Sequence, residues 1–175
     1  LIISGLGDLH LSVMVGRMKE RFNVEVELGT PKVSYKETIT KTAKIQGKYK
    51  RQSGGRGQYG DVWIQVEPLE KGKGFEFIDK IFGGAIPKNF IPAVEKGVVQ
   101  ACLEGAVAGY PIEDIRVRLV DGSYHEVDSS DMAFQIAGSM ALRKAVLEAG
   151  PVLLEPIMDV AVVILKNIWA QSREI

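Results

Sequence analysis

A glycine-rich stretch between two runs of alternating apolar and polar residues limits the folds open to this chain. The stretch SGGRGQYG, residues 53–60, follows KTAKIQGKYKRQ and precedes DVWIQVEPL. Alternation with a period of two is typical of a β-strand that buries one face. Two such runs joined by glycines predict an antiparallel hairpin with a long loop at its tip.

The other segments predict strands and helices in an irregular order. Helical spacing of apolar residues predicts three helices, over residues 7–22, about 91–104 and 130–149. Alternating or apolar runs predict five further strands, over residues 23–28, 33–39, 75–82, 112–120 and 153–165. Because strands and helices do not alternate as a doubly wound sheet requires, we predict an α+β fold with helices packed on one face of a sheet.

Composition excludes several classes of protein. The 175 residues are 46% hydrophobic, which suits one globular domain or parts of several. No run approaches the roughly eighteen apolar residues of a membrane span, and the single Cys102 excludes an internal disulfide. We therefore expect a cytoplasmic monomer that binds no membrane. The first residues, LIISGLGDLH, lack an initiating methionine, so we expect a fragment of a longer chain.

Positive charge is concentrated in the predicted hairpin. The formal net charge is zero, yet residues 38–60 contain Lys41, Lys44, Lys48, Lys50, Arg51 and Arg56 and no acidic residue. Glycines remove side chains from the tip, so that backbone amides, Arg56 and Gln58 can approach a polyanion while Tyr59 stacks on a base. Lys48, Lys50 and Arg51 on the stem supply charge. An RNA-binding hairpin and a merely flexible loop both fit this pattern.

Gly55, Gly57 and Gly60 also match the dinucleotide-binding pattern G-x-G-x-x-G. That site requires a helix directly after the glycines, with its N-terminus at the pyrophosphate. A predicted strand follows here instead. We therefore expect no nucleotide at these glycines.

The second loop of interest, DGSYHEVDSSDMAF, contains His125 among acids and serines. A metal site or a Ser/His/Asp triad needs groups that converge from separate parts of a fold, which adjacent loop residues rarely do. Capping of the following helix by Asp128, Ser129 or Ser130 accounts for most of the loop. It leaves Tyr124 and His125 unexplained. The other histidine, His10, is expected to pack within the first helix.

Six motifs together resemble one protein family. They are GLGDLHL, QSGGRGQYGDV, IPAVEKG, AGYP, GSYHEVDSSDMAF and PVLLEPIMDV, and in this order they are similar to the C-terminal half of bacterial elongation factor G, the ribosomal translocase. The match runs from Leu1 to about Val163. It implies that residues 1–30 end a third domain, that residues 31–153 form a fourth domain, and that residues 154–175 begin a fifth.

The resemblance also implies folds for these parts. The fourth domain is expected to resemble the second domain of ribosomal protein S5, flanked by partial ferredoxin-like βαββαβ pieces. The fragment is expected to have no catalytic residue, metal or cofactor, because GTP and Mg²⁺ belong to an N-terminal GTPase domain.

Residues that contact RNA are implied in the two loops at the tip of the fourth domain. In this family the tip enters the decoding region of the small ribosomal subunit during GTP-dependent translocation and meets the messenger RNA and the anticodon arm of the transfer RNA. A paralogue acting in ribosome recycling, a secondary form of the factor and a free-standing RNA-binding domain remain alternatives. The implied tip residues are Ser53, Gly54, Gly55, Arg56, Gly57, Gln58, Tyr59, Ser123, Tyr124 and His125, supported by Lys48, Lys50 and Arg51.

Overall fold

The structure, a computed structural model, describes residues 2–30, 33–52 and 57–159. The chain divides into two compact units, Leu1–Val33 and Ser34–Ile175.

The first unit contains one helix, α1 (Asp8–Phe22). Asn23 ends it in the left-handed conformation, and its N–H donates to the Lys19 carbonyl at 3.0 Å. The predicted strand over residues 23–28 is wrong: these residues form no strand and are exposed. A strand needs a partner for its backbone groups, and the described residues provide none.

The expectation for His10 is also wrong. No residue of α1 is buried, so the helix offers His10 no apolar interior to join. The imidazole is exposed and its Nδ1 accepts a hydrogen bond from the Leu6 N–H at 3.2 Å.

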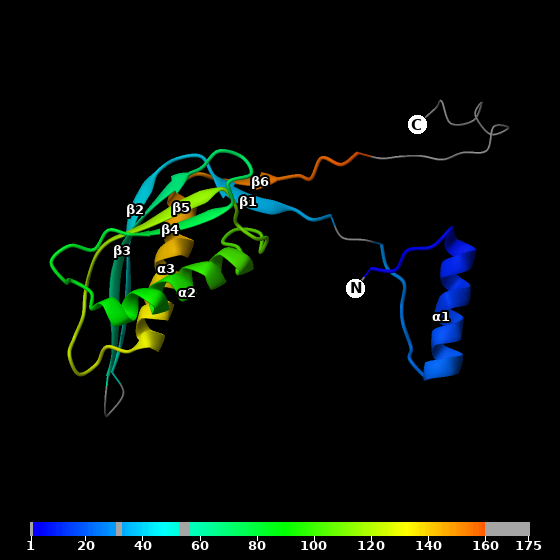
Figure 1. The fold of residues 1–175 in the computed structure, drawn as a ribbon, viewed down its shortest axis with the longest axis horizontal. Coiled ribbons are helices and arrows are strands. Elements are labelled where there is room, and N and C mark those ends of the chain that lie inside the picture. Colours follow the sequence, from blue (N-terminus) through cyan, green and yellow to red (C-terminus); the bar gives the residue numbers. More distant parts are fainter. Residues whose placement is uncertain (1, 31–32, 53–56, 160–175) are drawn as a thin grey trace. The chain divides into compact units, whose positions relative to one another are not determined.

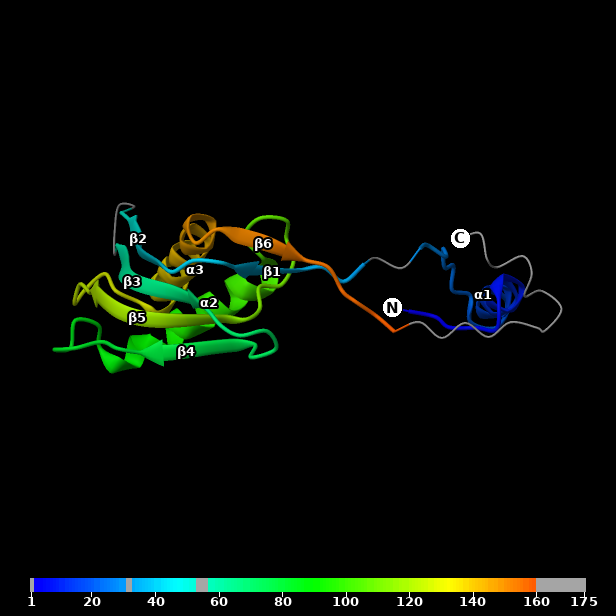
Figure 2. The ribbon, with the colours of Figure 1, turned by 90° about the horizontal axis from the view of Figure 1, so that it is seen from above.

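The second unit contains a four-stranded sheet with the order β2-β3-β5-β4 (Figures 1 and 2). Its strands are β2 (Ala43–Arg51), β3 (Gln58–Pro68), β4 (Phe75–Asp79) and β5 (Ile115–Ser123). The pairs β2–β3 and β3–β5 are antiparallel, whereas β4 and β5 are parallel. Parallel neighbours need a long crossover, and here it contains the short 3₁₀ helix η1 (Lys88–Phe90) and α2 (Ile91–Glu104).

Two helices lie on one side of this sheet, α2 and α3 (Asp131–Glu148), as Figure 1 shows. The core lies between them and the strands, where the inward-facing apolar residues of β3 and β5 are fully buried: Val62, Ile64, Val66, Ile115, Val117 and Leu119. Glycines allow α3 to approach closely, because a Cβ on Gly47 would lie 2.3 Å from the Ala137 carbonyl oxygen. The predicted α+β fold with helices on one sheet face is confirmed.

Cys102 belongs to this core. Its side chain is buried on α2, and burial raises the pKa of the thiol to about 12. A thiol with so high a pKa is neutral at pH 7 and chemically inert.

A separate two-stranded ribbon pairs β1 (Lys36–Ile39) with β6 (Pro151–Leu154). The predicted strand over residues 153–165 is therefore misplaced in its described part, since residues 155–159 form no strand. The register explains the end of β6: Leu154 pairs with Lys36, the first residue of β1, so no partner follows. Residues 160–165 lie outside the described residues.

The strand order positions the two predicted loops. β3 starts and β5 ends at the same end of the sheet, because the two strands are antiparallel neighbours. The hairpin tip before β3 and the loop after β5 therefore emerge side by side.

Candidate nucleic-acid interface

The first loop of the interface is the tip of the predicted hairpin. β2 and β3 pair continuously from Ala43 with Val66 to Arg51 with Gln58, so the prediction of a hairpin is confirmed. Residues 52–57 separate the two strands in the sequence. Four of the predicted contact residues, Ser53, Gly54, Gly55 and Arg56, lie outside the described residues.

The second loop, residues 124–130, joins β5 to α3 and contacts the first directly. The Tyr59 N–H donates to the Asp128 carbonyl at 2.8 Å, and the Ser129 hydroxyl donates to the Tyr59 carbonyl at 3.0 Å. The Gly57 N–H donates to the Asp128 carboxylate at 3.0 Å. These three bonds join the two loops into one surface, which we call the paired loops (residues 57–59 and 123–129).

A polar network below the paired loops orients Tyr59. The Ser123 hydroxyl donates to Asp61 at 2.8 Å, so its oxygen is left to accept from the Tyr59 hydroxyl at 2.7 Å. Gln46 donates to the other oxygen of the buried Asp61 carboxylate at 2.8 Å. The hydroxyls of Tyr59 and Ser123 thus already have protein partners, and the Tyr59 ring remains partly accessible.

Tyr124 and His125 are both exposed on the second loop. Tyr124 is 43% exposed and the His125 side chain 59% exposed. His125 Nδ1 lies 3.6 Å from the Asp128 carboxylate, and its ring centroid lies 6.4 Å from that of Tyr59. The His125 backbone is fixed because its N–H donates to the Ser129 hydroxyl at 2.9 Å. The backbone that carries the imidazole is therefore fixed, while the side chain stays exposed.

The remaining described residues of the predicted interface lie on β2 and at the start of β3. Gln58 is partly buried, and its side-chain oxygen accepts from the Tyr49 hydroxyl at 3.2 Å, which leaves its amide N–H₂ as the donor end. Lys48, Lys50 and Arg51 are exposed. The Lys48 ammonium lies 5.7 Å from the centre of the Tyr59 ring, within the range of a cation–π contact.

The sequence offers Asp128, Ser129 and Ser130 as caps of α3, and the structure gives two of them another role. Ser130 is the cap of α3, since its side chain accepts from the Ala133 N–H. Asp128 and Ser129 instead hold the first loop. Capping and cross-loop bonding use the same residue types, so sequence alone could not separate them.

The glycines of the hairpin do not form a dinucleotide site in the described part. Gly60 lies within β3 and is followed by strand rather than helix, and a Cβ there would lie 2.6 Å from the Ala133 carbonyl oxygen of α3. Gly60 thus serves close packing of the hairpin on α3. Among the described residues, no three His, Cys, Asp or Glu side chains are grouped as a metal site requires.

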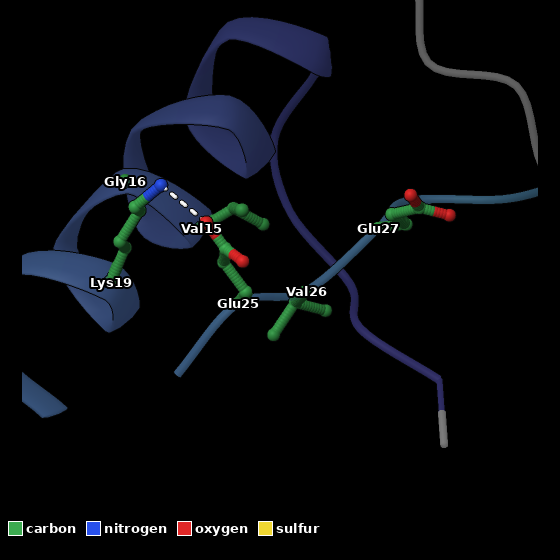
Figure 3. A pocket seen from close by; sticks show the side chains of 6 residues that line it. All are labelled: Val15, Gly16, Lys19, Glu25, Val26 and Glu27. Atoms are coloured by element: carbon green, nitrogen blue, oxygen red, sulfur yellow. Dashed lines mark hydrogen bonds and ion pairs between the residues drawn. The ribbon is translucent and has the colours of Figure 1, made fainter. Parts of the chain in front are cut away.

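The first unit carries its own pocket, of about 650 Å³, between α1 and the segment 25–27 (Figure 3). Lys19 and Glu25 form an exposed ion pair across it at 2.5 Å. No predicted interface residue lines it; the lining residues are Val15, Gly16, Lys19, Glu25, Val26 and Glu27.

Across the described residues, no helix is both long and apolar enough to span a membrane.

Asp128 provides a direct test of the link between the loops. In Asp128→Ala the Gly57 N–H loses its acceptor, and we expect its hydrogen exchange, followed by NMR, to accelerate about tenfold, the equivalent of roughly 1.4 kcal/mol. Asp128→Asn keeps an acceptor oxygen and should restore most of the protection. Equal protection of Gly57 in wild type and Asp128→Ala would contradict the link.

Comparison with known proteins identifies the family. The family model for elongation factor G domain IV matches residues 31–150, and the model for domain III matches residues 1–30. Elongation factor G from Aquifex pyrophilus is 61% identical over 162 residues, which are 93% of this chain and 23% of that protein. A crystal structure from Thermus thermophilus superposes with a TM-score of 0.76 at 49% identity and covers 85% of this chain and 22% of that one.

The chain thus spans about a quarter of the length of the relative it matches. The domain IV model alone matches residues 31–150, more than half of the chain, and this match includes both of the paired loops. The chain belongs to the elongation factor G family.

Proposed function

We propose that the paired loops are the RNA-contacting end of a translation elongation factor. The observation that carries this proposal is the direct bonding of the two loops by Asp128 and Ser129, with His125 and Tyr124 exposed beside them. The surface is organised before any partner arrives, so binding loses little conformational entropy.

The two loops offer different chemistry to RNA. Lys48, Lys50 and Arg51 supply positive charge for phosphates along the hairpin. His125 can donate to, accept from or stack on a ribose or base, while the acids around it disfavour phosphate. We therefore assign the RNA backbone to the hairpin, and grooves, sugars or bases to the second loop.

In the whole factor this end would enter the decoding region of the small ribosomal subunit and hold the messenger RNA paired with the anticodon arm of a transfer RNA. Translocation then needs only contacts that differ between the two RNA arrangements, and no bond-making residue in this fragment. GTP and Mg²⁺ would be held by the GTPase domain of the full-length protein, which would be the enzyme. Its place of action would be the cytoplasm.

His125→Ala in the full-length factor tests this proposal. Loss of a contact worth about 1.4 kcal/mol that forms in the transition state for movement, and is absent before it, should slow single-round translocation roughly tenfold. GTP hydrolysis on the ribosome should keep its rate. Stopped-flow fluorescence of a labelled messenger RNA measures the first rate, and phosphate release the second.

The other histidine is the matched control. His10 is also exposed but lies in the first unit, so His10→Ala should leave both rates unchanged. A wild-type translocation rate in His125→Ala would remove His125 from the interface. An equal slowing in both variants would show that the effect is not specific to the paired loops.

A further inference from the structure

Phe82 stands out among the apolar side chains of the second unit. It lies in the loop between β4 and η1 and is 94% exposed, more than any other large apolar residue described in that unit. An exposed phenylalanine gives up the stabilisation that burial would provide. Single exposed apolar residues are common, so its setting has to decide whether it has a role.

The loop that carries Phe82 is anchored on both sides of it. On one side the Lys80 N–H donates to the Leu119 carbonyl at 2.8 Å, and the Ile81 N–H donates to Asp79 at 2.9 Å. On the other side Ile86 is 1% exposed and belongs to the core. The backbone on both sides of Phe82 is therefore fixed, while its ring is exposed.

Two glycines shape the turn directly after Phe82. Gly83 and Gly84 have φ angles of 66° and 74°, in the left-handed region where other residues are strained. A Cβ at either position would meet no other atom within 4 Å. The two residues after Phe82 thus add no side chains beside it, and the ring itself is 94% exposed, as a flat ligand requires.

The Phe82 loop lies beside the strand that leads to the paired loops. Asp79 pairs with Leu119 of β5, which continues in the same direction to Ser123. Ile86 packs on Gly122, where a Cβ would lie 2.4 Å from Ile86 Cδ1. Figure 2 shows the loop after β4 next to the end of β5. Phe82 and the paired loops therefore occupy the same end of the sheet.

The surroundings of Phe82 favour a nucleobase over an apolar protein surface. Lys80 and Lys88 are exposed near it in the chain, and the nearest acid, Asp79, already accepts a hydrogen bond. Protein partners usually bind contiguous apolar patches, whereas an unpaired base needs one aromatic face with cations nearby for its phosphates. We propose that Phe82 is a further RNA-binding residue, which stacks on an unpaired base of the RNA held by the paired loops.

This inference rests on the proposed function, and RNA binding by the 175-residue chain can test both. The probe is a fluorescein-labelled RNA stem–loop with about seven unpaired loop nucleotides, titrated at low salt and followed by fluorescence anisotropy. Phe82→Leu removes the ring but keeps an apolar side chain, and should weaken binding about tenfold. Phe82→Trp keeps a stacking surface and should bind within about twofold of wild type.

Two controls accompany these variants. Phe22→Leu changes another exposed phenylalanine, which is in the first unit, and should bind like wild type. A fully paired RNA of equal length offers no unpaired base, so Phe82→Leu should not weaken its binding. The ring carries no charge, so the dependence of Kd on salt should keep its slope in Phe82→Leu.

The outcomes separate the two proposals. Wild-type affinity in Phe82→Leu together with weaker binding in His125→Ala would overturn the role of Phe82 and support the paired loops. Weaker binding by Phe82→Leu, with wild-type affinity in His125→Ala, would support RNA binding by Phe82 and count against the paired loops. Absence of any binding by the wild-type chain would overturn both.

Discussion

Replacing Gly97 with alanine is expected to destabilise the second unit by about 2 kcal/mol, although alanine is normally the better helix former by about 1 kcal/mol. Gly97 is buried in the middle of α2, where a Cβ would lie 2.0 Å from the Gln135 carbonyl oxygen of α3. A Cβ on Gly138 of α3 would likewise lie 2.8 Å from the Val94 carbonyl oxygen of α2. The two helices therefore cross at a pair of glycines, and alanine would force them apart.

Urea unfolding followed by circular dichroism measures this effect. Lys96→Ala is the matched control, since Lys96 is the exposed neighbour of Gly97 on the same helix. The control should change the free energy of unfolding by less than about 0.5 kcal/mol. If Gly97→Ala were as stable as wild type or more so, helix propensity would outweigh the contact and the close crossing would be wrong.

The alternation of apolar and polar residues was sufficient to predict the strands that bury one face. In the predicted strand over residues 112–120, Ile115, Val117 and Leu119 alternate with Arg116 and Arg118, and all three apolar residues are 0% exposed. The hairpin was predictable because its glycines and both flanking strands are consecutive in the sequence. In such cases the period of the side chains determines which face meets the core.

Pairing between distant segments was not predictable in the same way. The alternation of residues 23–28 equals that of a real strand, but no described segment pairs with it. The end of β6 depends on where β1 begins, more than a hundred residues earlier. A strand boundary is thus set by its partner, which local periodicity does not contain.

The same distinction between local pattern and distant contacts applies to the candidate interface. Tyr124 and His125, which helix capping leaves unexplained, are exposed in the structure. The bonds from Asp128 and Ser129 to the hairpin cross about 70 residues of sequence, and only the fold reveals them. Contact of these residues with RNA stays a prediction.

Glu37→Gln is expected to lower the free energy of unfolding at pH 7 by about 3 kcal/mol. Glu37 lies on β1 and is 1% exposed, and its carboxylate accepts four backbone N–H groups of the turn after α2. The donors are Ala106, Val107, Ala108 and Tyr110, at 2.7–3.2 Å. Glutamine keeps one acceptor oxygen but places an N–H₂ group against two of these donors, which leaves them buried without partners.

The pH dependence of this difference identifies the charge as its cause. Burial by itself raises the pKa of Glu37, but the four N–H donors outweigh it, and the net pKa lies below the ordinary value of 4.5. A carboxylate with a lowered pKa stabilises the fold fully above its unfolded pKa and loses this contribution as pH falls through its folded pKa. The gap between wild type and Glu37→Gln should therefore be constant near neutrality and narrow below about pH 4.5.

Urea unfolding at a series of pH values measures this gap, and subtracting the two proteins cancels the other carboxylates. Glu113→Gln is the control, because the Glu113 side chain is 40% exposed and forms its ion pair with the exposed Lys36, at 2.7 Å. Its effect should stay below about 1 kcal/mol, as for surface ion pairs generally. A gap that kept its size down to about pH 3 would mean that the charge of Glu37 is not what stabilises the turn. A gap below about 1 kcal/mol at pH 7 would refute the role of Glu37 altogether, since four charge-assisted bonds in a buried site cannot be lost at so small a cost.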